Sequence, residues 1–591
     1  MRTASVLILS NVRPLRAWTF ANRLLREVPG AEICGIVQRP MRSIPRLQRM
    51  LAMAHLRGAY ATHGWWSQAQ LLLLSMMDKI VDWFCWFVHG CPRLLSSSGF
   101  TADRLTQECA KAGWPFAVVA EDSESSVATL ACPAKVDLVI LLGQFSSIPE
   151  FSARASIGCI WASDHKPSAG QVEPGRDALI SIEHLAQGTQ TPFKIASLIL
   201  PWQPFDGPLG FRLKADLIAD DLLLETAENL LRGDAATAST LVSQWVNRVL
   251  TPLLSQLDGM GQRACRDGRG GNRCRPAWKL CLDTLLLLSP RILVKNWHRR
   301  MSAQYPLLVL AHHLVADRPH RMGVSTETLW RQVLFLRKHY RIVGLSEGVG
   351  LLRSGQISAP TVVLTFDDGY ADNFLNLRAV TNEIGISPTL FVTTDPVEAH
   401  REFAHDLATG TTGFFPLTWD QIQYWNTRGA EFGSHTRTHF DCGSVHLENL
   451  QSEILGSRND LEARLKRTVE FFAFPYGKHK NMSSEAKRLA ASAYTHYVSF
   501  LGGESLAKAG QSQTHLFRKK FYRSQWELEL ELQSVFDLVD DIKAWFHRRA
   551  SHSSKPPDRP LVASPRPSSI HPVGPPPAST AIYSRAKNPC N

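Results

Sequence analysis

Short apolar runs and amphipathic stretches alternate along the first half of the chain. Runs rich in Val, Ile and Leu, bounded by polar or turn residues, predict buried strands at 5–10, 32–37, 116–119 and 136–143. Residues 18–28, between the first two runs, carry apolar positions at helical spacing, and so does the stretch 222–231. Strands that alternate with helices are typical of a parallel α/β sheet.

The second half repeats this alternation. Apolar runs predict strands at 307–313, 360–366, 387–392, 430–433 and 469–474. Between them, Ser325 can cap a helix whose apolar face includes Leu329 and Leu336, and helical spacing recurs from Leu447 to Leu461. The whole chain therefore reads as α/β, with two successive sheets.

Chemically reactive side chains follow three of these strands. The run 360–366 ends in Asp367, Asp368 and Gly369, and the glycine lets the chain turn sharply. Enzymes with parallel barrels place their chemistry at the carboxyl ends of strands. Two adjacent carboxylates repel each other, so we expect a cation or a shared proton nearby, although a solvated turn alone would also have this sequence.

A metal site is predicted from two further loops. His435 and His439 are four residues apart in Gly-Ser-His-Thr-Arg-Thr-His, so both imidazoles can reach one ion, with Asp368 as a carboxylate third ligand. This ligand set suits zinc, and also cobalt, nickel or iron, and it leaves positions for water and substrate. The alternative is a pair of surface histidines. The third loop, after residues 472–474, is Pro475-Tyr476-Gly477.

In this order, the three loops resemble the polysaccharide deacetylase family, the NodB homology domain, over roughly residues 305–525. The resemblance implies a distorted (β/α) barrel of about seven units that holds a divalent metal. It implies that Asp367 is the general base and that the backbone N–H of Tyr476 helps bind the oxyanion. The substrate-binding candidates are Tyr370, Pro475, Tyr476 and Gly477.

One branch of this family has a Tyr-His pair at the end of its first strand, close to the metal site, and this pair suggests which residue donates the proton. His312-His313 stands there, so we expect His313 to be the general acid, with a structural histidine as the alternative; His515 is a second candidate. The family's arginine that orients the base is replaced by Ala473, and Arg518 or Lys519 could take its place.

The order of elements in residues 1–235 resembles the formyltransferase fold. That family's Gly-x-Ile-Asn-x-His stretch aligns with residues 158–163, where Trp161 and Ser163 replace the Asn and the His. Formyl transfer needs those groups held around the formyl carbon. We therefore expect a degenerate, Rossmann-like domain without catalytic function.

Length and composition predict the domain boundaries and the charge of the protein surface. At 591 residues the chain exceeds one core, and we expect a formyltransferase-like domain at 1–258, a Gly/Arg linker and connecting helix at 259–300, the deacetylase-like barrel at 301–548 and a disordered Pro/Ser-rich tail at 549–591. The net charge of +12 favours anionic surroundings or is simply a basic surface, and no nucleic-acid motif accompanies it.

Two apolar segments raise the question of membrane contact, and the cysteines and the first segment indicate the cellular compartment. The Trp-rich stretch 65–93 is interrupted by Asp and Lys and has no run of ~20 apolar residues, so it is either a packed helix or a peripheral membrane contact. The apolar piece 285–294 is followed by Lys295, Arg299 and Arg300, which suits a membrane surface or a helix that joins domains. Eleven scattered Cys and a first segment without the pattern of a secretory signal predict a cytoplasmic protein.

These observations predict a metal-dependent hydrolase that removes an N-acetyl group from an amino sugar of an oligosaccharide, a polysaccharide or a carrier-linked sugar, as chitooligosaccharide deacetylases do. Two alternatives stay open. The first is a carbohydrate-binding or scaffolding protein with an inactive barrel. The second is a bifunctional enzyme that also formylates an amino sugar, against which Trp161 and Ser163 argue.

Overall fold

The structure is a computed structural model. It describes residues 3–39, 100–118, 136–143, 145, 155–164, 176–203, 205–233, 235–260, 277–443, 446–506, 514–521 and 525–542. Residues 1–539 form one compact unit that contains both predicted sheets, and a second unit begins at residue 540. The predictions for 65–93, for the Gly/Arg stretch 261–276 and for the tail 549–591 lie outside the described residues.

The N-terminal sheet has the strand order β3-β2-β1-β4-β5-β6-β7. The five strands from β3 to β5 are parallel, whereas β6 and β7 are antiparallel additions at one edge. Apolar side chains on both faces of the central strands are buried, which explains their unbroken hydrophobic runs. The strands are Ala4–Ser10 (β1), Ala31–Gln38 (β2), Phe116–Val118 (β3), Leu138–Leu142 (β4), Gly158–Asp164 (β5), Ala178–Leu185 (β6) and Phe193–Leu200 (β7).

Helix α5 spans Pro208–Arg232 and is much longer than the helix predicted at 222–231. Most of its side chains are buried on all sides, because it packs against β6 and β5 of the first sheet and against α12 and α10 of the second domain. The other helices of this half are Pro14–Glu27 (α1), Ala102–Ala112 (α4), Ala235–Trp245 (α6), the π-helical turn Val246–Leu250 (η3) and Thr251–Met260 (α7).

The second sheet closes into a parallel barrel of seven strands, in the order β12-β13-β14-β15-β16-β17-β8, because β8 pairs with both β17 and β12. β11 pairs with the first half of β12 and lies outside the ring. The barrel strands are Leu307–His312 (β8), Thr361–Phe366 (β12), Thr389–Val392 (β13), Glu431–Ser434 (β14), Phe471–Ala473 (β15), His496–Ser499 (β16) and His515–Lys520 (β17), with β11 at Arg341–Val343.

Helices surround the barrel, and the helix cap predicted at Ser325 forms. Ser325 accepts a hydrogen bond from the Thr328 N–H at the start of α10, and Thr418 and Gln421 form a capping box at the start of α15. The helices are Thr326–His339 (α10), Leu345–Arg353 (α11), Asp372–Ile384 (α12), Thr394–Ala399 (α13), Ala404–Leu407 (α14), Trp419–Thr427 (α15), Leu447–Leu465 (α16), Ser484–Ala493 (α17) and Gln525–Leu532 (α18); the two-residue strands Leu314–Val315 (β9) and Gly323–Val324 (β10) precede α10.

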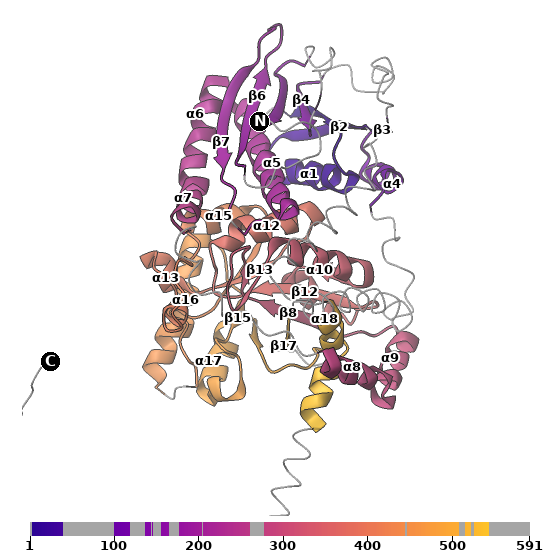
Figure 1. Cartoon of the computed structure of the whole chain (residues 1–591), viewed down its shortest axis with the longest axis vertical. Coiled ribbons are helices and arrows are strands. Elements are labelled where there is room, and N and C mark those ends of the chain that lie inside the picture. The colour runs from indigo at the N-terminus through magenta and orange to yellow at the C-terminus, as the bar shows by residue number, and fades with distance from the viewer. Residues whose placement is uncertain are drawn as a thin grey trace, which may run out of the picture. The chain divides into compact units, whose positions relative to one another are not determined.

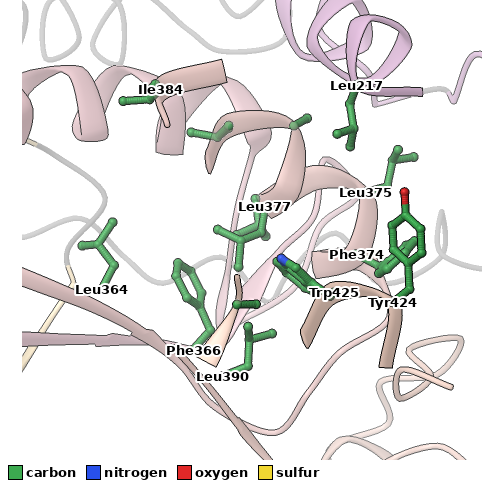
Figure 2. Packing of buried hydrophobic residues seen from close by; sticks show 14 of the residues in the cluster. Leu217, Leu364, Phe366, Phe374, Leu375, Leu377, Ile384, Leu390, Tyr424 and Trp425 are labelled. Atoms are coloured by element: carbon green, nitrogen blue, oxygen red, sulfur yellow. The ribbon is translucent and has the colours of Figure 1, made fainter. Parts of the chain in front are cut away.

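One apolar core continues from the first domain into the second. In Figure 2, Leu217 of α5 lies near Leu375 of α12, with Phe374 and Tyr424 alongside. Further in, Phe366 and Leu390 from the barrel strands face the other side of α12. Helix α12 therefore separates the barrel from α5, and it begins four residues after Asp368.

Buried ion pairs accompany this core, and we call Arg23, Glu27, Asp221, Arg378 and Arg428 the interface cluster. Arg23 donates to Asp221 at 2.6 Å and to Glu27 at 2.8 Å. Arg378 of α12 donates to both oxygens of Asp221, at 3.1 and 2.9 Å. Arg428, which follows α15, lies 3.2 Å from Glu27. Each carboxylate thus pairs with Arg23 of its own domain and with one arginine of the second domain, Arg378 for Asp221 and Arg428 for Glu27.

Two short helices stand at the edge of the barrel, beside α18 (Figure 1). They are Ala277–Leu285 (α8) and Pro290–Ser302 (α9), joined by the 3₁₀ turn Leu286–Leu288 (η5). Pro290 ends the apolar run, as its sequence position predicts, and takes the first turn of α9. Among the described residues, no helix has the length and the apolar content needed to cross a membrane.

Candidate metal and catalytic site

The three reactive loops lie at the same end of the barrel, because all its strands are parallel. Asp367 and Asp368 follow β12, and His435 follows β14 directly. The loops are tied together by backbone hydrogen bonds: the His435 N–H donates to Val392 O at 2.9 Å, and the Thr393 N–H donates to Asp368 O at 3.3 Å. The sequence prediction that these residues meet is therefore fulfilled in space.

Asp368, His435 and His439 form a three-residue cluster whose possible ligand atoms all lie within 4.8 Å of one another. Asp368 Oδ1 is 3.6 Å from His435 Nε2 and 3.4 Å from His439 Nε2. The Nδ1 atom of His435 lies 2.8 Å from the carbonyl oxygen of Ala473, so Nδ1 carries the proton and Nε2 keeps its lone pair for a metal.

The electrostatics of this cluster fit a cation. Both carboxylate oxygens of Asp368 are buried, and among the described residues neither has a hydrogen-bond donor. Burial and the nearby carboxylates of Asp367 and Asp406 raise the pKa of Asp368 well above its usual range. Burial also lowers the pKa of both His435 and His439, which keeps them neutral, as metal ligands must be. A bound cation would remove the cost of burying Asp368 as a carboxylate.

The backbone around the cluster is strained. Asp368 (φ 69°), Thr436 (φ 66°), His439 (φ 62°) and Tyr476 (φ 59°) occupy the left-handed region, which costs roughly 1–3 kcal/mol for each such residue. The strain turns neighbouring side chains from three loops toward one point. Clustering of strained residues is characteristic of functional sites.

Glu453 of α16 holds the histidine loop. Its Oε2 accepts hydrogen bonds from the backbone N–H groups of Arg437 and Thr438, both at 2.9 Å, and its Oε1 accepts from the Thr438 hydroxyl at 2.8 Å. These bonds fix the segment between His435 and His439. The position of the two imidazoles therefore depends on a helical side chain that lies 14 residues after His439 in the chain.

Asp367 lies beside the cluster and pairs with Arg518 of β17. Arg518 Nη1 is 2.5 Å from Asp367 Oδ1, and both side chains are buried. Burial raises the pKa of Asp367, but Arg518 and His435 outweigh this effect and lower it to about 2. Of the two residues expected to replace the missing arginine, Arg518 faces Asp367, whereas Lys519 pairs with Asp537 at 2.7 Å.

The comparison with protein families identifies this part of the chain. The model of the family "Polysaccharide deacetylase" matches residues 354–495. Residues 354–495 are a polysaccharide deacetylase domain. The match includes the loops that carry Asp367, Asp368, His435 and His439. The first and last strands of the barrel, with His313 and Arg518, lie outside the matched residues.

Individual relatives share only part of the chain. The YxkH protein of Bacillus subtilis (strain 168), named for the same family, is 23% identical over 129 residues, which is 22% of this chain and 41% of the relative. Among solved structures, the Streptococcus pyogenes deacetylase PplD has 20% identity and a TM-score of 0.33, over 39% of this chain and 99% of PplD. IcaB from Ammonifex degensii has 19% identity and a TM-score of 0.33, over 39% and 97%. The formyltransferase resemblance of the N-terminal half stays a prediction.

His313 stands next to the candidate metal site. Burial is the main cause that lowers its pKa to about 4; Asp367 opposes this, and His435 and Arg518 add to it. Its imidazole is therefore neutral at pH 7. His515 is placed differently: it begins β17, at the opposite end of the barrel strands, and stacks on Tyr497. This position is wrong for the second candidate acid, because only the carboxyl ends of the strands reach the site.

The substrate-binding candidates divide into exposed and buried groups. Tyr476 is 50% exposed, and its ring stands edge-on to His439, with 4.9 Å between centroids. Pro475 and Gly477 are buried. A Cβ at Gly477 would lie 2.5 Å from the Phe500 N, so the loop needs glycine there. Tyr370 is completely buried and donates to Asp406 at 2.7 Å. Its ring has no surface that a sugar could touch, so it supports the wall of the site instead.

The candidate site contains further polar groups that the sequence alone does not single out. His405 of α14 lies 3.7 Å from Asp368 Oδ2, and its Nε2 is 2.9 Å from the Tyr370 hydroxyl. Asp406 accepts from Tyr370 and lies 3.2 Å from His320. No spacing in the sequence connects α14 with the other three loops, so only the folded structure reveals this second group of polar residues.

Proposed function

We propose that this chain is a metal-dependent hydrolase that removes the N-acetyl group from an amino sugar, in an oligosaccharide, a polysaccharide or a sugar on a carrier. The observation that carries the proposal is the cluster of Asp368, His435 and His439 beside the paired Asp367, inside a polysaccharide deacetylase domain. Hydrolysis of an amide needs an activated water, a group that polarises the carbonyl and a proton for the leaving amine.

The ligand set would hold a divalent ion, for which zinc is our first choice. Two imidazoles and one carboxylate suit zinc, and three protein ligands leave room for water and for the acetyl oxygen. When bound, the metal lowers the pKa of a water molecule and polarises the acetyl carbonyl. The orphaned oxygens of Asp368 and the fixed tautomer of His435 support this assignment.

Asp367 is our candidate base. Arg518 occupies Oδ1 and keeps the group ionised, which leaves Oδ2 to accept a proton from water. A carboxylate whose pKa is about 2 is a weak base for ordinary water, so Asp367 can act only on water that has become more acidic. Its contribution is to hold that water in one orientation and to take its proton.

His313 is our candidate proton donor, and the exposed loop with Tyr476 is the candidate oxyanion and sugar contact. Because His313 is neutral at pH 7, it can donate to the leaving amine only after it has received a proton, and the nearby Asp367 is the group that can supply one. In the described part of the chain, no group accepts a hydrogen bond from the Tyr476 N–H, so this donor can turn to a substrate oxygen.

The test is deacetylation of a panel of N-acetylhexosamine oligomers by the full chain, before and after treatment with a chelator and after zinc is restored. We expect loss and recovery of the reaction. Asp367→Asn should keep its metal and lose most turnover, whereas Asp420→Asn, the same change at an exposed position, should behave as the wild type. A protein that binds zinc and the oligomers but releases no acetate would instead be a carbohydrate-binding protein with an inactive barrel.

A further inference from the structure

The helix pair α8–α9 has an unusual surface. Four large apolar residues of α9 are exposed: Trp297 by 63%, Met301 by 70%, Val294 by 62% and Leu293 by 42%. Leu282 and Leu285 of α8 and Leu288 of the η5 turn are each more than half exposed as well. We call these seven residues the apolar face. They come from only 20 consecutive positions, and exposed large apolar residues gathered in this way mark an interaction site.

The opposite side of α9 is the side that holds it to the barrel, and it is polar. Lys295 donates to Gln533 O at 2.9 Å and lies 3.2 Å from Glu504, and Arg299 pairs with the same glutamate. Ile292 is the apolar residue buried on this side. The usual amphipathic arrangement is thus inverted, because the charges face the protein and the apolar side chains face outward. Burial of apolar surface against the barrel cannot explain why α9 carries these apolar side chains, because they face away from the barrel.

The charges around the apolar face are basic. On the helical wheel of α9, Arg300 flanks one side of the Leu293–Trp297–Met301 stripe and His298 flanks the other, and both are exposed. Residues 277–302 contain five Lys or Arg and a single acidic residue, Asp283, which is buried. A helix with an exposed apolar stripe, a Trp and flanking cations has the composition of a helix that lies in a membrane interface.

We infer that the apolar face of α8–α9 docks on the surface of a bilayer that contains anionic phospholipids. The apolar side chains would enter the boundary between headgroups and acyl chains, and Arg300 would reach the lipid phosphates. The ion pairs of Lys295 and Arg299 with Glu504 keep α9 fixed on the barrel, so docking would bring the whole catalytic domain to the membrane. The inference uses none of the residues of the deacetylase site and stands or falls separately from the proposed function.

The experiment is flotation of the full chain with vesicles of phosphatidylcholine, or of phosphatidylcholine mixed with phosphatidylglycerol. We expect binding to the mixed vesicles that weakens with added salt. The variant Leu293→Ser/Trp297→Ser/Met301→Ser should lower the partition coefficient about tenfold or more, and Arg300→Gln should lower it about fivefold on the mixed vesicles only. The matched control is Phe193→Ser/Ile199→Ser/Leu241→Ser, which removes exposed apolar side chains from β7 and α6 and should bind as the wild type.

Two further measurements remove the remaining explanations. Hydrogen exchange of the full chain should show that vesicles protect the backbone of 282–301, and the pair Leu285→Ser/Leu288→Ser should weaken binding if the triple variant is unstable. Absence of binding by the wild type, or unchanged binding of both α8–α9 variants, would overturn the inference. So would light scattering that shows a dimer which these variants dissociate, because the apolar face would then cover a second copy of the chain.

Discussion

Two groups of buried charges in this protein are built in opposite ways. In the interface cluster, each carboxylate has at least two guanidinium partners, and Asp221 receives hydrogen bonds from both Arg23 and Arg378. In the candidate metal site, Asp368 is equally buried, and its two oxygens lack donors among the described residues. Its closest polar neighbours there are neutral imidazoles and another carboxylate.

The difference separates charges that hold the fold from charges that wait for a ligand. A buried ion whose partners are built into the chain is satisfied in the metal-free protein, and removal of one partner leaves the other uncompensated. A buried carboxylate without a partner costs stability until a cation arrives. Helix α12 joins the two groups, because its first turn follows the Asp367-Asp368 loop and its middle carries Arg378.

The largest effect is expected at Asp368. Asp368→Asn should lower metal content and reduce deacetylation about a thousandfold or more, because a ligand is lost. The free energy of unfolding of the chelated protein should nevertheless rise, by about 1 kcal/mol, because the substitution removes an uncompensated charge. Metal analysis, turnover and denaturant unfolding of one preparation test this, with Asp420→Asn as the control. If chelated Asp368→Asn were instead several kcal/mol less stable than the chelated wild type, Asp368 would stabilise the metal-free fold as the carboxylates of the interface cluster do.

Asp221→Asn should have the reverse profile. Arg23 and Arg378 would each lose an anionic partner inside the protein, so the free energy of unfolding should fall by about 3–5 kcal/mol, whereas metal affinity of the folded protein stays unchanged. Denaturant unfolding measures the loss. Glu347→Gln, which removes an exposed pair with Arg341, should cost no more than about 1 kcal/mol. Equal effects of the two variants would mean that burial of the pair does not matter.

The two regions also differ in how far the sequence predicts them. The site loops were predicted from the sequence because each follows a strand directly, and parallel strands bring their carboxyl ends together; Asp368, His435 and His439 meet as that reasoning requires. The interface cluster was not predicted. Its members come from α1, α5, α12 and the turn after α15, and charged residues in helices ordinarily face solvent, so nothing local marks them as buried.

Long-range contacts also explain why some elements of the fold are not predicted correctly from the sequence. The strands β16 and β17 were overlooked because His496–Ser499 is short and His515–Lys520 is rich in basic residues, two of which, Arg518 and Lys519, are buried by pairing with carboxylates from other elements. Helix α5 was predicted too short because it is apolar on more than one side, which removes the clear helical period. Long-range partners decide these cases.

A smaller effect on metal affinity is expected at Glu453, which holds the loop between His435 and His439 without touching the ligand atoms. Glu453→Ala frees the backbone N–H groups of Arg437 and Thr438, so metal affinity should fall by about 10–100-fold, and zinc in excess should restore most of the turnover. Competition with a chelator of known affinity measures this. The control is Glu448→Ala in the exposed first turn of the same helix. Loss of turnover that excess zinc does not rescue would show that Glu453 acts on more than the loop.

The smallest effect concerns the stability of the fold at acidic pH. Burial raises the pKa of Glu27, but Arg23 and Arg428 outweigh this and lower it to about 2. A carboxylate whose pKa is lower in the folded than in the unfolded chain stabilises the fold above the unfolded pKa of 4.5, and this contribution is lost as the pH falls toward 2. Between pH 5 and pH 4, the stability difference between the wild type and Glu27→Gln should therefore shrink by about 0.7 kcal/mol. Denaturant unfolding of both proteins at the two pH values measures it; a difference that grows toward pH 4 would mean that Glu27 is not held by its arginines.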